Sequence, residues 1–431
     1  MDYCKYVGSS RNVGFISTRL AGTDGVSLET IKWADVFKKE NFNCFYFAGD
    51  LDYPPKCSYL VEEAHFKHPE IRYIYSNCFG VRVRGRAITQ NIQKIKRKLK
   101  THIYNFIEKF DLDLLVLQNV LAIPLNIPLG IAIAEVLSES GMPAIAHHHD
   151  FFWEREHFKI NAVWEYLGMA FPPHLPSLQH VIINSSAAHQ LSIRRGVTGT
   201  LIPNVMDFEN PPQVKDDYTT NVRKDLGIDD DELFILQPTR VVKRKGIEHA
   251  IELVRKLGIK AKLIISHASD DEGHDYEIRV KEYSRMLNVN TLFVSDIINE
   301  CRGVTETGKK IYTLNDIYPH ADLVTYPSNF EGFGNAFLEA VYYKKPIVVN
   351  TYSIYSMDIK PKGFYTIELN GYVTDGAVSM TRKVLRDAVF RKKMVDHNFN
   401  VARRYYSYDI LHQKLRNIIN DMTNTYPVWH T

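Results

Sequence analysis

Two glutamates stand eight positions apart in a segment where an apolar run, a glycine loop and a helical pattern follow one another. Glu331 precedes the loop, whose free backbone N–H groups can bind phosphate or sugar oxygens. Glu339 falls inside an apolar helix expected over residues 336–343, where a carboxylate is costly unless it accepts hydrogen bonds, for instance from ribose hydroxyls. The alternative is structural, with one carboxylate capping a helix and the other in an ion pair.

A basic segment between a predicted strand at residues 233–237 and a predicted helix at residues 247–257 is a second candidate site. Its four cations are Arg240, Lys243, Arg244 and Lys245. Arginine offers a fixed fork to phosphate oxygens and lysine a mobile point charge, which suits the neutralisation of a diphosphate leaving group. A solvated basic turn is the alternative.

A glycine-containing loop follows the first predicted strand, at residues 12–17. Gly22 and Gly25 allow close backbone approach before a helix expected from about Ser27. The N–H groups and the dipole of a helix N-terminus favour a phosphate. The alternative is a tight strand–helix turn that Ser27 caps.

Three consecutive histidines, His147 to His149, and Asp150 follow another predicted strand, at the edge where doubly wound sheets place ligands. A histidine there can bond a sugar hydroxyl or respond to charge at a reacting carbon. Neighbouring residues of a strand point in opposite directions, so one metal ion would not gather all three rings. A buried structural role is the alternative for one or two of them.

The elements that position these residues follow a strand–helix rhythm along the whole chain. Strands are predicted at residues 12–17, 42–48, 114–118, 144–147 and 181–184, and again at 233–237, 261–266, 292–294, 323–326 and 346–349. Continuous apolar runs such as residues 114–118 favour parallel strands covered on both faces. Apolar residues at steps of three and four predict helices over residues 88–110 and 408–422. The sequence predicts an α/β fold.

Composition limits the class of protein. With 431 residues, 45% of them hydrophobic, the chain is too long for one core, and we expect two domains with a linker over residues 211–220. A formal charge of +3 gives no sign of a nucleic-acid partner. The five cysteines are scattered without metal-ligand spacing, which predicts reduced thiols and a cytoplasmic protein. No segment has the roughly 20 apolar residues of a membrane span, and the first residues lack a signal-peptide core.

Taken in order, these segments resemble the GT-B nucleotide-sugar glycosyltransferases, and within them the retaining family 4, which includes sucrose-phosphate synthases and phosphatidylinositol mannosyltransferases. The resemblance covers nearly the whole chain and rests on residues 22–27, 149–150, 202–204, 240–246 and the E-x7-E motif of Glu331 and Glu339. It implies two Rossmann-like domains that face each other across a cleft. The implied divisions are an acceptor domain (1–205), a nucleotide-sugar donor domain (206–405) and a C-terminal crossover helix (406–431) packed on the first domain.

The resemblance also implies roles for individual residues. The catalytic residues would be His149 near the transferred sugar, Arg240 and Lys245 at the diphosphate, and Glu331 at the sugar hydroxyls. Glu339 would bind ribose. The remaining implied donor-binding residues are Gly25, Asn204, Gly332, Phe333, Gly334 and Asn335. The chain departs from the family at Thr239, where glycine is usual, and at Asn335-Ala336, where Leu-Pro is common.

The implied reaction is the retaining transfer of a hexose from a UDP- or GDP-sugar to a hydroxyl of a small acceptor, without a metal or another cofactor. No matched pair of carboxylates stands in the proposed site, so attack from the leaving-group face is expected, with the leaving phosphate taking the acceptor proton. The expected acceptor-binding residues are Arg19, Asp24 and Arg155. Cations near predicted loops of the first domain, Arg19, Arg82, Arg84, Arg86 and Arg155, suggest a phosphorylated or carboxylated acceptor. Ordinary surface arginines are the alternative.

Two other classes of function stay open. Lys94, Lys96, Arg97, Lys98 and Lys100 share the polar face of the helix at residues 88–110, which also fits a peripheral membrane enzyme with a lipid or glycolipid acceptor. A sugar-nucleotide epimerase or an inactive nucleotide-sugar binding module would share the same fold. An acidic insert at residues 267–276 is interpreted as a solvated loop, with a cation site as the alternative. The expected partners are a nucleotide sugar and a small acceptor, and the sequence predicts no oligomeric state.

Overall fold

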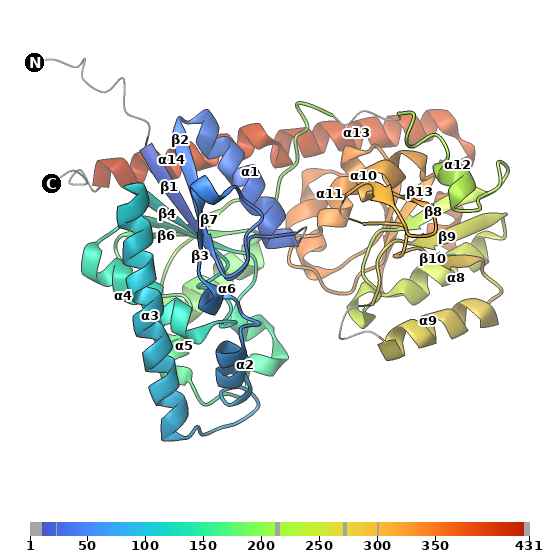
Figure 1. Cartoon of the computed structure of the whole chain (residues 1–431). Helices are drawn as coiled ribbons and strands as arrows, with labels where there is room; N and C mark the ends of the chain where they lie inside the picture. Colours follow the sequence, from blue (N-terminus) through green and yellow to red (C-terminus); the bar gives the residue numbers. More distant parts are fainter. Residues whose placement is uncertain (1–10, 23, 212–215, 270–273, 300, 426–431) are drawn as a thin grey trace, which may run out of the picture. The chain divides into compact units, whose positions relative to one another are not determined.

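The computed structural model of the chain describes residues 11–22, 24–211, 216–269, 274–299 and 301–425 (Figure 1). The chain divides into two compact units. The first unit runs to Pro203 and takes up the chain again from Leu411, and the second comprises Asn204–Ile410. The family resemblance implies the corresponding divisions at 205/206 and 405/406.

The first unit is built on a seven-stranded parallel sheet with the order β3-β2-β1-β4-β5-β6-β7. The strands are β1 (Arg11–Ile16), β2 (Phe42–Ala48), β3 (Ser58–Leu60), β4 (Leu114–Gln118), β5 (Ala144–His148), β6 (Leu178–Ile182) and β7 (Thr200–Leu201). The strand order reverses between β1 and β4. In open parallel sheets the carboxyl ends of the strands at such a point form the usual ligand crevice.

The helices of this unit connect consecutive strands. They are α1 (Gly25–Lys39), α2 (Pro69–Ser76), α3 (Arg86–Phe110), α4 (Ile127–Ser140), α5 (Trp164–Ala170) and α6 (Ser185–Arg195). The predicted apolar stripe of α3 is buried from Ile88 to Phe106, and Phe110 stacks on Phe45. Burial of this stripe holds the long helix to the unit.

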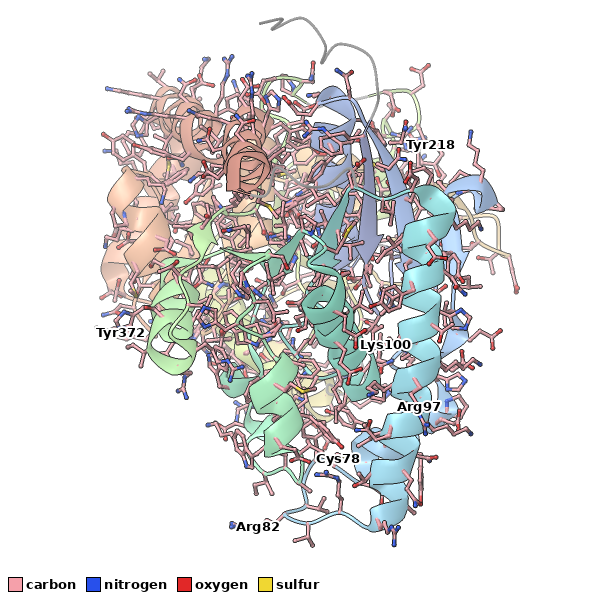
Figure 2. All side chains as sticks on the ribbon, turned by 90° about the vertical axis from the view of Figure 1, so that its left-hand side faces the viewer. Cys78, Arg82, Arg97, Lys100, Tyr218 and Tyr372 are labelled. Atoms are coloured by element: carbon pink, nitrogen blue, oxygen red, sulfur yellow. The ribbon has the colours of Figure 1, made fainter. Side chains whose placement is uncertain are left out.

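The polar face of α3 carries lysines that pair with carboxylates of the same unit. Lys96 and Lys100 lie 2.7 and 3.0 Å from Glu135, and Figure 2 labels Arg97 and Lys100 on the helix. Lys98 contacts Glu63 and Lys94 lies 3.6 Å from Glu70. These pairs offset much of the positive charge that a basic membrane-binding face would need. Across the described ranges, no helix combines the length and the apolar character of a membrane span.

The second unit contains a six-stranded parallel sheet with the order β10-β9-β8-β13-β14-β15. The strands are β8 (Leu233–Gln237), β9 (Ala261–Ile265), β10 (Thr291–Phe293), β13 (Leu323–Tyr326), β14 (Ile347–Asn350) and β15 (Ile367–Leu369). Its helices are α7 (Val222–Asp225), α8 (Ile247–Leu257), α9 (His274–Met286), α10 (Leu314–Ile317), α11 (Asn335–Tyr342), α12 (Asp375–Arg386) and α13 (Ala388–Tyr406). Here the strand order reverses between β8 and β13.

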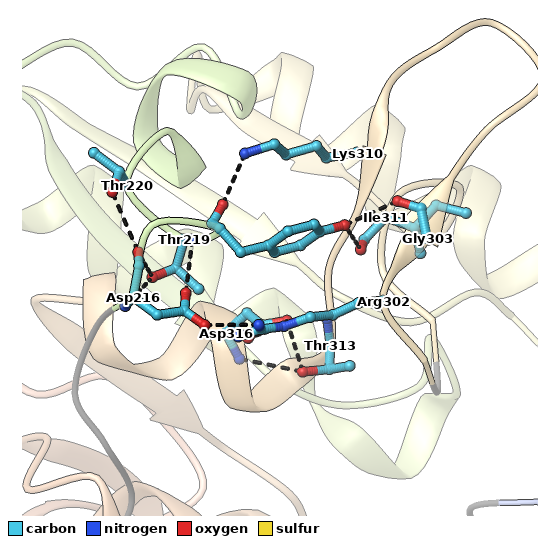
Figure 3. A network of polar contacts seen from close by, with 10 residues as sticks. Asp216, Thr219, Thr220, Arg302, Gly303, Lys310, Ile311, Thr313 and Asp316 are labelled. Carbon is cyan, nitrogen blue, oxygen red and sulfur yellow. Dashed lines mark hydrogen bonds and ion pairs between the residues drawn. The ribbon is translucent and has the colours of Figure 1, made fainter.

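Residues 216–220, which belong to the predicted linker, are anchored in the second unit (Figure 3). The Tyr218 hydroxyl lies 2.8 Å from the carbonyl oxygens of both Gly303 and Ile311, on the two strands of a small hairpin, β11 (Gly303–Val304) and β12 (Lys310–Ile311). Arg302 and Lys310 lie 4.7 and 4.8 Å from the centroid of the Tyr218 ring. The tyrosine therefore holds this stretch to the hairpin.

The last described helix, α14 (Tyr408–Thr425), joins the first unit from Leu411 onward. Its predicted apolar residues Leu411, Leu415, Ile418, Ile419 and Met422 are buried. The imidazole of His412 contacts the carboxylate of Glu40 at the end of α1. The chain thus ends its described part in the unit where it began.

Candidate active site

The carboxyl ends of β1, β4 and β5 are joined by polar side chains in the first unit. The Ser17 hydroxyl after β1 donates to the carbonyl of Gln118 at 3.0 Å. Asn119, which directly follows β4 with a φ of 56°, accepts from the backbone N–H of His149 at 2.9 Å and donates to Asp150 at 3.1 Å. Asparagine tolerates this left-handed conformation better than most residues. Asn119, which the sequence analysis did not single out, fixes the loop after β5 to the loop after β4.

The three histidines point to different surroundings, as the alternation of a strand predicts. His147 Nδ1 lies 2.9 Å from Gln118 Oε1, and its ring stacks on Trp33 of α1 with centroids 4.2 Å apart. His148 Nε2 lies 3.0 Å from Nδ1 of the buried His180. His147 and His148 are buried, whereas His149 is partly exposed. In the part of the chain that the structure describes, no group of three or more His, Cys, Asp or Glu side chains is arranged to hold a metal ion.

His149 is electrostatically suited to stay neutral. Burial lowers the pKa of His149 to about 4, although Asp150 and Asp24 oppose this shift. Its ring lies 4.5 Å from the ring of His147, and its Nε2 is buried without a hydrogen-bond partner. A neutral ring with an unpaired nitrogen can accept or donate one hydrogen bond to a ligand at this edge.

The loop after β1 is arranged differently from the expectation. Helix α1 begins at Gly25, and Asp24 rather than Ser27 caps it by accepting from the N–H groups of Val26 and Ser27 at 3.0 and 3.2 Å. Arg19 lies 2.8 Å from the same carboxylate. Asp24 therefore occupies the N–H groups of Val26 and Ser27, as an N-cap aspartate does, and the predicted contact of Gly25 with a phosphate stays a prediction.

The other arginine predicted for the acceptor is also paired. Arg155 lies 2.5 Å from Asp150, the residue that follows His149. Two arginine–aspartate pairs, Arg19 with Asp24 and Arg155 with Asp150, thus stand in the loops after β1 and β5. The charges of Asp150 and Asp24 both act to raise the pKa of His149, against the larger effect of burial, so both aspartates lie near this ring.

In the second unit, Lys245 and Glu331 form a buried ion pair. Both residues are 8% exposed, and the lysine ammonium contacts the glutamate carboxylate. Arg244 lies 3.1 Å from the same carboxylate. Burial would raise the pKa of Glu331, but Lys245 and Arg244 outweigh it and hold that pKa below its usual value. Glu331 is thus an ionised, oriented carboxylate. Arg244 is its second cationic partner. The sequence named Arg244 among the four cations of the basic segment but predicted no role for it.

The glycine loop between the two glutamates needs a glycine at Gly334. Its φ is 118°, and a Cβ there would lie 2.3 Å from the hydroxyl of Tyr352. That hydroxyl donates to the carbonyl of Phe333 at 2.8 Å. Helix α11 starts at the next residue, Asn335, whose side chain accepts from Asn204 at 2.7 Å. The loop is thereby tied to Asn204, and Gly332 within it is partly exposed.

Glu339 lies on α11 and is partly buried. Its Oε2 accepts a hydrogen bond of 2.8 Å from the hydroxyl of Tyr318, whose ring stacks on Tyr343 with centroids 5.0 Å apart. Tyr318, which the sequence analysis did not foresee, supplies a donor that offsets the cost of burying the carboxylate.

Thr239 departs from the family pattern and has a structural partner. Gln237 at the end of β8 donates to the Thr239 hydroxyl at 2.8 Å, and Thr325 on β13 donates to the other end of the Gln237 amide at 2.7 Å. All three side chains are buried where the strand order of the second sheet reverses. The next residue, Arg240, is exposed, and its charge acts on Lys245.

Some predicted features lie outside the described residues. They include three residues of the acidic insert, Asp270, Asp271 and Glu272. They also include Cys4 near the start of the sequence and Thr23 in the first glycine loop. Residues 274–276 of the insert form the start of helix α9.

The amino-acid sequence is similar to those of known proteins. The sequence profile described as "Glycosyl transferases group 1" matches residues 219–386. The chain is 30% identical over 443 residues to mannosylglucosylglycerate synthase of Petrotoga mobilis, covering 96% of this chain and 98% of that protein. It is 32% identical over 421 residues to mannosylglucosylglycerate synthase of Thermotoga maritima, covering 90% and 95%.

Solved structures show the same fold at low identity. Sucrose-phosphate synthase from Thermosynechococcus elongatus matches with a TM-score of 0.66 at 13% identity over 96% of this chain and 100% of that one. A glycosyltransferase from Rickettsia africae matches with a TM-score of 0.67 at 13% identity over 97% and 99%. The chain belongs to the group 1 glycosyl transferases and is a hexosyltransferase with the GT-B fold.

Proposed function

We propose that the enzyme transfers a hexose, with retention of configuration, from a nucleoside diphosphate sugar to a hydroxyl of a small hexosyl acid, of which a hexosyl glycerate is the first candidate. The observation that carries this proposal is the similarity to two mannosylglucosylglycerate synthases over at least 90% of this chain. The name of those relatives describes a product with a mannosyl, a glucosyl and a glycerate part. A nucleoside diphosphate mannose is therefore the first donor to test.

The second unit offers groups suited to the donor. Arg240 and Lys245 are the proposed partners of the diphosphate, and the N-terminus of α11 after Gly334 adds a partial positive charge. These groups stabilise the charge that develops on the phosphate when the bond between the sugar and the diphosphate breaks. Glu331 would then accept hydroxyl hydrogens of the sugar, and Glu339, oriented by Tyr318, would accept those of the ribose.

The proposed chemistry needs no metal ion, because the cations of residues 240–245 take the role that a metal would have. The acceptor oxygen attacks the sugar carbon from the side of the leaving group, and the leaving phosphate takes the acceptor proton. His149, neutral and with an unpaired Nε2, is the proposed contact to the transferred sugar. The cytoplasmic location rests on the scattered cysteines and stays a prediction.

Binding of the donor tests the proposal. Thermal unfolding would be followed with GDP-, UDP- and ADP-sugars, each with and without EDTA, since a ligand that binds only the folded protein raises its stability. We expect a shift with one nucleotide that EDTA leaves unchanged and that Glu339→Ala abolishes. Glu282→Ala, an exposed glutamate on α9, is the matched control and should keep the shift. If the shift requires a divalent metal, the metal-independent mechanism is wrong.

A lipid acceptor is less well supported. Four lysines of α3 are paired with glutamates, which leaves a weaker cationic face than the sequence pattern suggested. Sedimentation with vesicles containing anionic lipid should leave the enzyme in the supernatant at physiological salt. An enzyme that pellets with the vesicles would restore the membrane alternative.

A further inference from the structure

His147 is a buried titratable residue to which the proposed reaction gives no role. It lies on β5 two positions before His149, so the two side chains share one side of the strand, and His148 lies on the other. Burial lowers the pKa of His147 well below its usual value, which keeps the ring neutral. A neutral, buried ring therefore stands beside the proposed contact to the transferred sugar.

The edge of the His147 ring is fixed by a hydrogen bond. Its Nδ1 lies 2.9 Å from Oε1 of Gln118, the residue that pairs with His147 across β4 and β5. Because an amide oxygen can only accept a hydrogen bond, Nδ1 carries the proton and Nε2 keeps its lone pair. Gln118 is itself fully buried, and its backbone carbonyl accepts from the hydroxyl of Ser17. The His147 ring thus has one tautomer and one orientation.

Two aromatic contacts connect this ring to its surroundings. The indole of Trp33, buried on α1, stacks on His147 with centroids 4.2 Å apart and planes at 22°. The ring of His149 lies 4.5 Å from the ring of His147, with planes at 48°. We call Trp33, His147 and His149 the ring series. It leads from the core beneath α1 to the carboxyl edge of the sheet.

Packing, rather than a hydrogen bond, orients the ring of His149. Over the ranges that the structure describes, its side chain makes no hydrogen bond or ion pair. The N–H that donates to Asn119 belongs to the backbone of His149 and does not fix the ring. Three charged groups act on the pKa of the ring without pairing with it, namely Asp150, Asp24 and Lys32. Contact with His147 therefore decides how the ring of His149 is turned.

Orientation by packing has a consequence for the reaction. A hydrogen-bond partner in the protein would orient His149 but would occupy one of its two ring nitrogens. A stacked neighbour orients the ring and leaves both nitrogens to a ligand. We propose that His147 is a positioning residue that holds the ring of His149 toward the transferred sugar, with Trp33 as the support behind it. This inference rests on the proposed function for the role of His149, but the state of the ring is testable without transfer.

Steady-state kinetics of matched glutamine variants test the role in the reaction. His147→Gln keeps an amide for Gln118 but removes a ring from the series, so we expect kcat to fall about tenfold with little change in either KM. His148→Gln is the control, because both histidines are 1% exposed on the same strand but His148 pairs with His180. Its kcat should match wild type, and His147→Phe, which restores a ring, should recover most of the loss. An equal fall of kcat in both glutamine variants would overturn the proposal.

A double-variant cycle separates positioning from a general structural role. If His147 acts through His149, His147→Gln should lower kcat of the wild type but leave kcat of His149→Ala nearly unchanged. The same factor of loss in both backgrounds would overturn the positioning role. Trp33→Leu removes the support and keeps both histidines, so its effect on kcat should depend on His149 in the same way. This variant carries the test if His147→Gln does not fold.

Histidine titration by NMR tests the ring without turnover. In protein labelled with carbon-13 histidine, the signal of His149 is the one that His149→Ala lacks. Burial lowers the pKa of His149 to about 4, so this signal should stay constant in wild type from about pH 8 to 5.5. In His147→Gln, water reaches the uncovered ring and the signal should titrate within that interval, whereas in His148→Gln it should not.

The NMR result also separates this inference from the proposed reaction. If wild type transfers no hexose but the His149 signal titrates only in His147→Gln, the reaction is wrong and the positioning of the ring stands. If the signal behaves identically in wild type and both glutamine variants, the positioning role is overturned, whether or not the enzyme transfers a hexose.

Discussion

The ammonium of Lys245 contacts the carboxylate of Glu331 in the second unit, where both residues are buried. Removal of one partner leaves an uncompensated buried charge, which costs about 3–5 kcal/mol for buried pairs. We expect Glu331→Gln and Lys245→Met each to lower the free energy of unfolding by an amount approaching this range. The partial cover that Arg244 gives to Glu331 should make the lysine variant the milder one.

The double variant Lys245→Met/Glu331→Gln tests whether the two residues are energetically coupled. Because neither charge remains without its partner, its loss of unfolding free energy in urea should be clearly smaller than the sum of the two single losses. Additive losses would show that the two residues are not energetically coupled.

The hydrogen bond from Tyr318 to Glu339 predicts a positioning role for the tyrosine. Loss of one such bond to a charged group is worth about 1.5–3 kcal/mol. If Glu339 binds the donor, Tyr318→Phe should raise the donor KM by roughly tenfold, since 1.36 kcal/mol is a factor of ten, with little change in the acceptor KM. Tyr372→Phe, an exposed tyrosine of the same unit, is the control and should match wild type. Equal rises in both Michaelis constants would argue for a general loss of structure instead.

The buried chain of Thr239, Gln237 and Thr325 predicts a loss of stability on removing one hydroxyl. Thr239→Val keeps the shape of the side chain but leaves the Gln237 amide unpaired, at a cost of about 1–3 kcal/mol. Thr239→Ser retains the hydroxyl and should keep most of the stability. Denaturant unfolding of the two variants measures the difference, and equal stabilities would mean that the hydroxyl contributes nothing.

The buried histidines predict a dependence of stability on pH. Burial lowers the pKa values of His149 and His180 to about 4 in the folded protein, from a usual value of 6.5. Below pH 6.5 the unfolded chain takes up protons that the folded protein refuses, so stability is complete above pH 6.5 and falls as the pH decreases toward 4.

Unfolding free energies measured between pH 7.5 and 5 report this effect together with the opposite contribution of Glu154, whose pKa burial raises to about 7. The other carboxylates titrate mostly below this interval. Wild type should lose stability over that interval, and His180→Gln should lose less of it. A wild-type stability that stays constant from pH 7.5 to 5 would contradict the neutral state assigned to these rings.

Much of the fold follows from local sequence patterns. The strands Leu114–Gln118 and Leu233–Gln237 and the helix Ile247–Leu257 have the predicted bounds, because long apolar runs and regular steps reflect burial directly. Strand β6 begins at Leu178, three residues before the prediction, since the polar His180 interrupts the apolar run and finds its partner in His148. The short strands β3, β7 and β15 carry two or three residues each and gave no detectable pattern.

Residues of the candidate site are harder to predict from the sequence where the two residues that interact lie far apart along the chain. The motif of Glu331 and Glu339 stands out by its spacing, but Tyr318 lies 21 positions before Glu339 and belongs to no motif. The helix start was misplaced because both Asp24 and Ser27 are good capping residues, and only the pairing with Arg19 decides between them.

The most direct test of the proposed function is an NMR time course of GDP-mannose with a glucosyl glycerate in the presence of EDTA. It follows the release of nucleoside diphosphate and the anomeric proton of the product. We expect release only when the acceptor is present, and a product whose new linkage has the anomeric configuration of the donor. If neither GDP- nor UDP-hexoses react with this acceptor, or if the new linkage is inverted, the proposed function is contradicted.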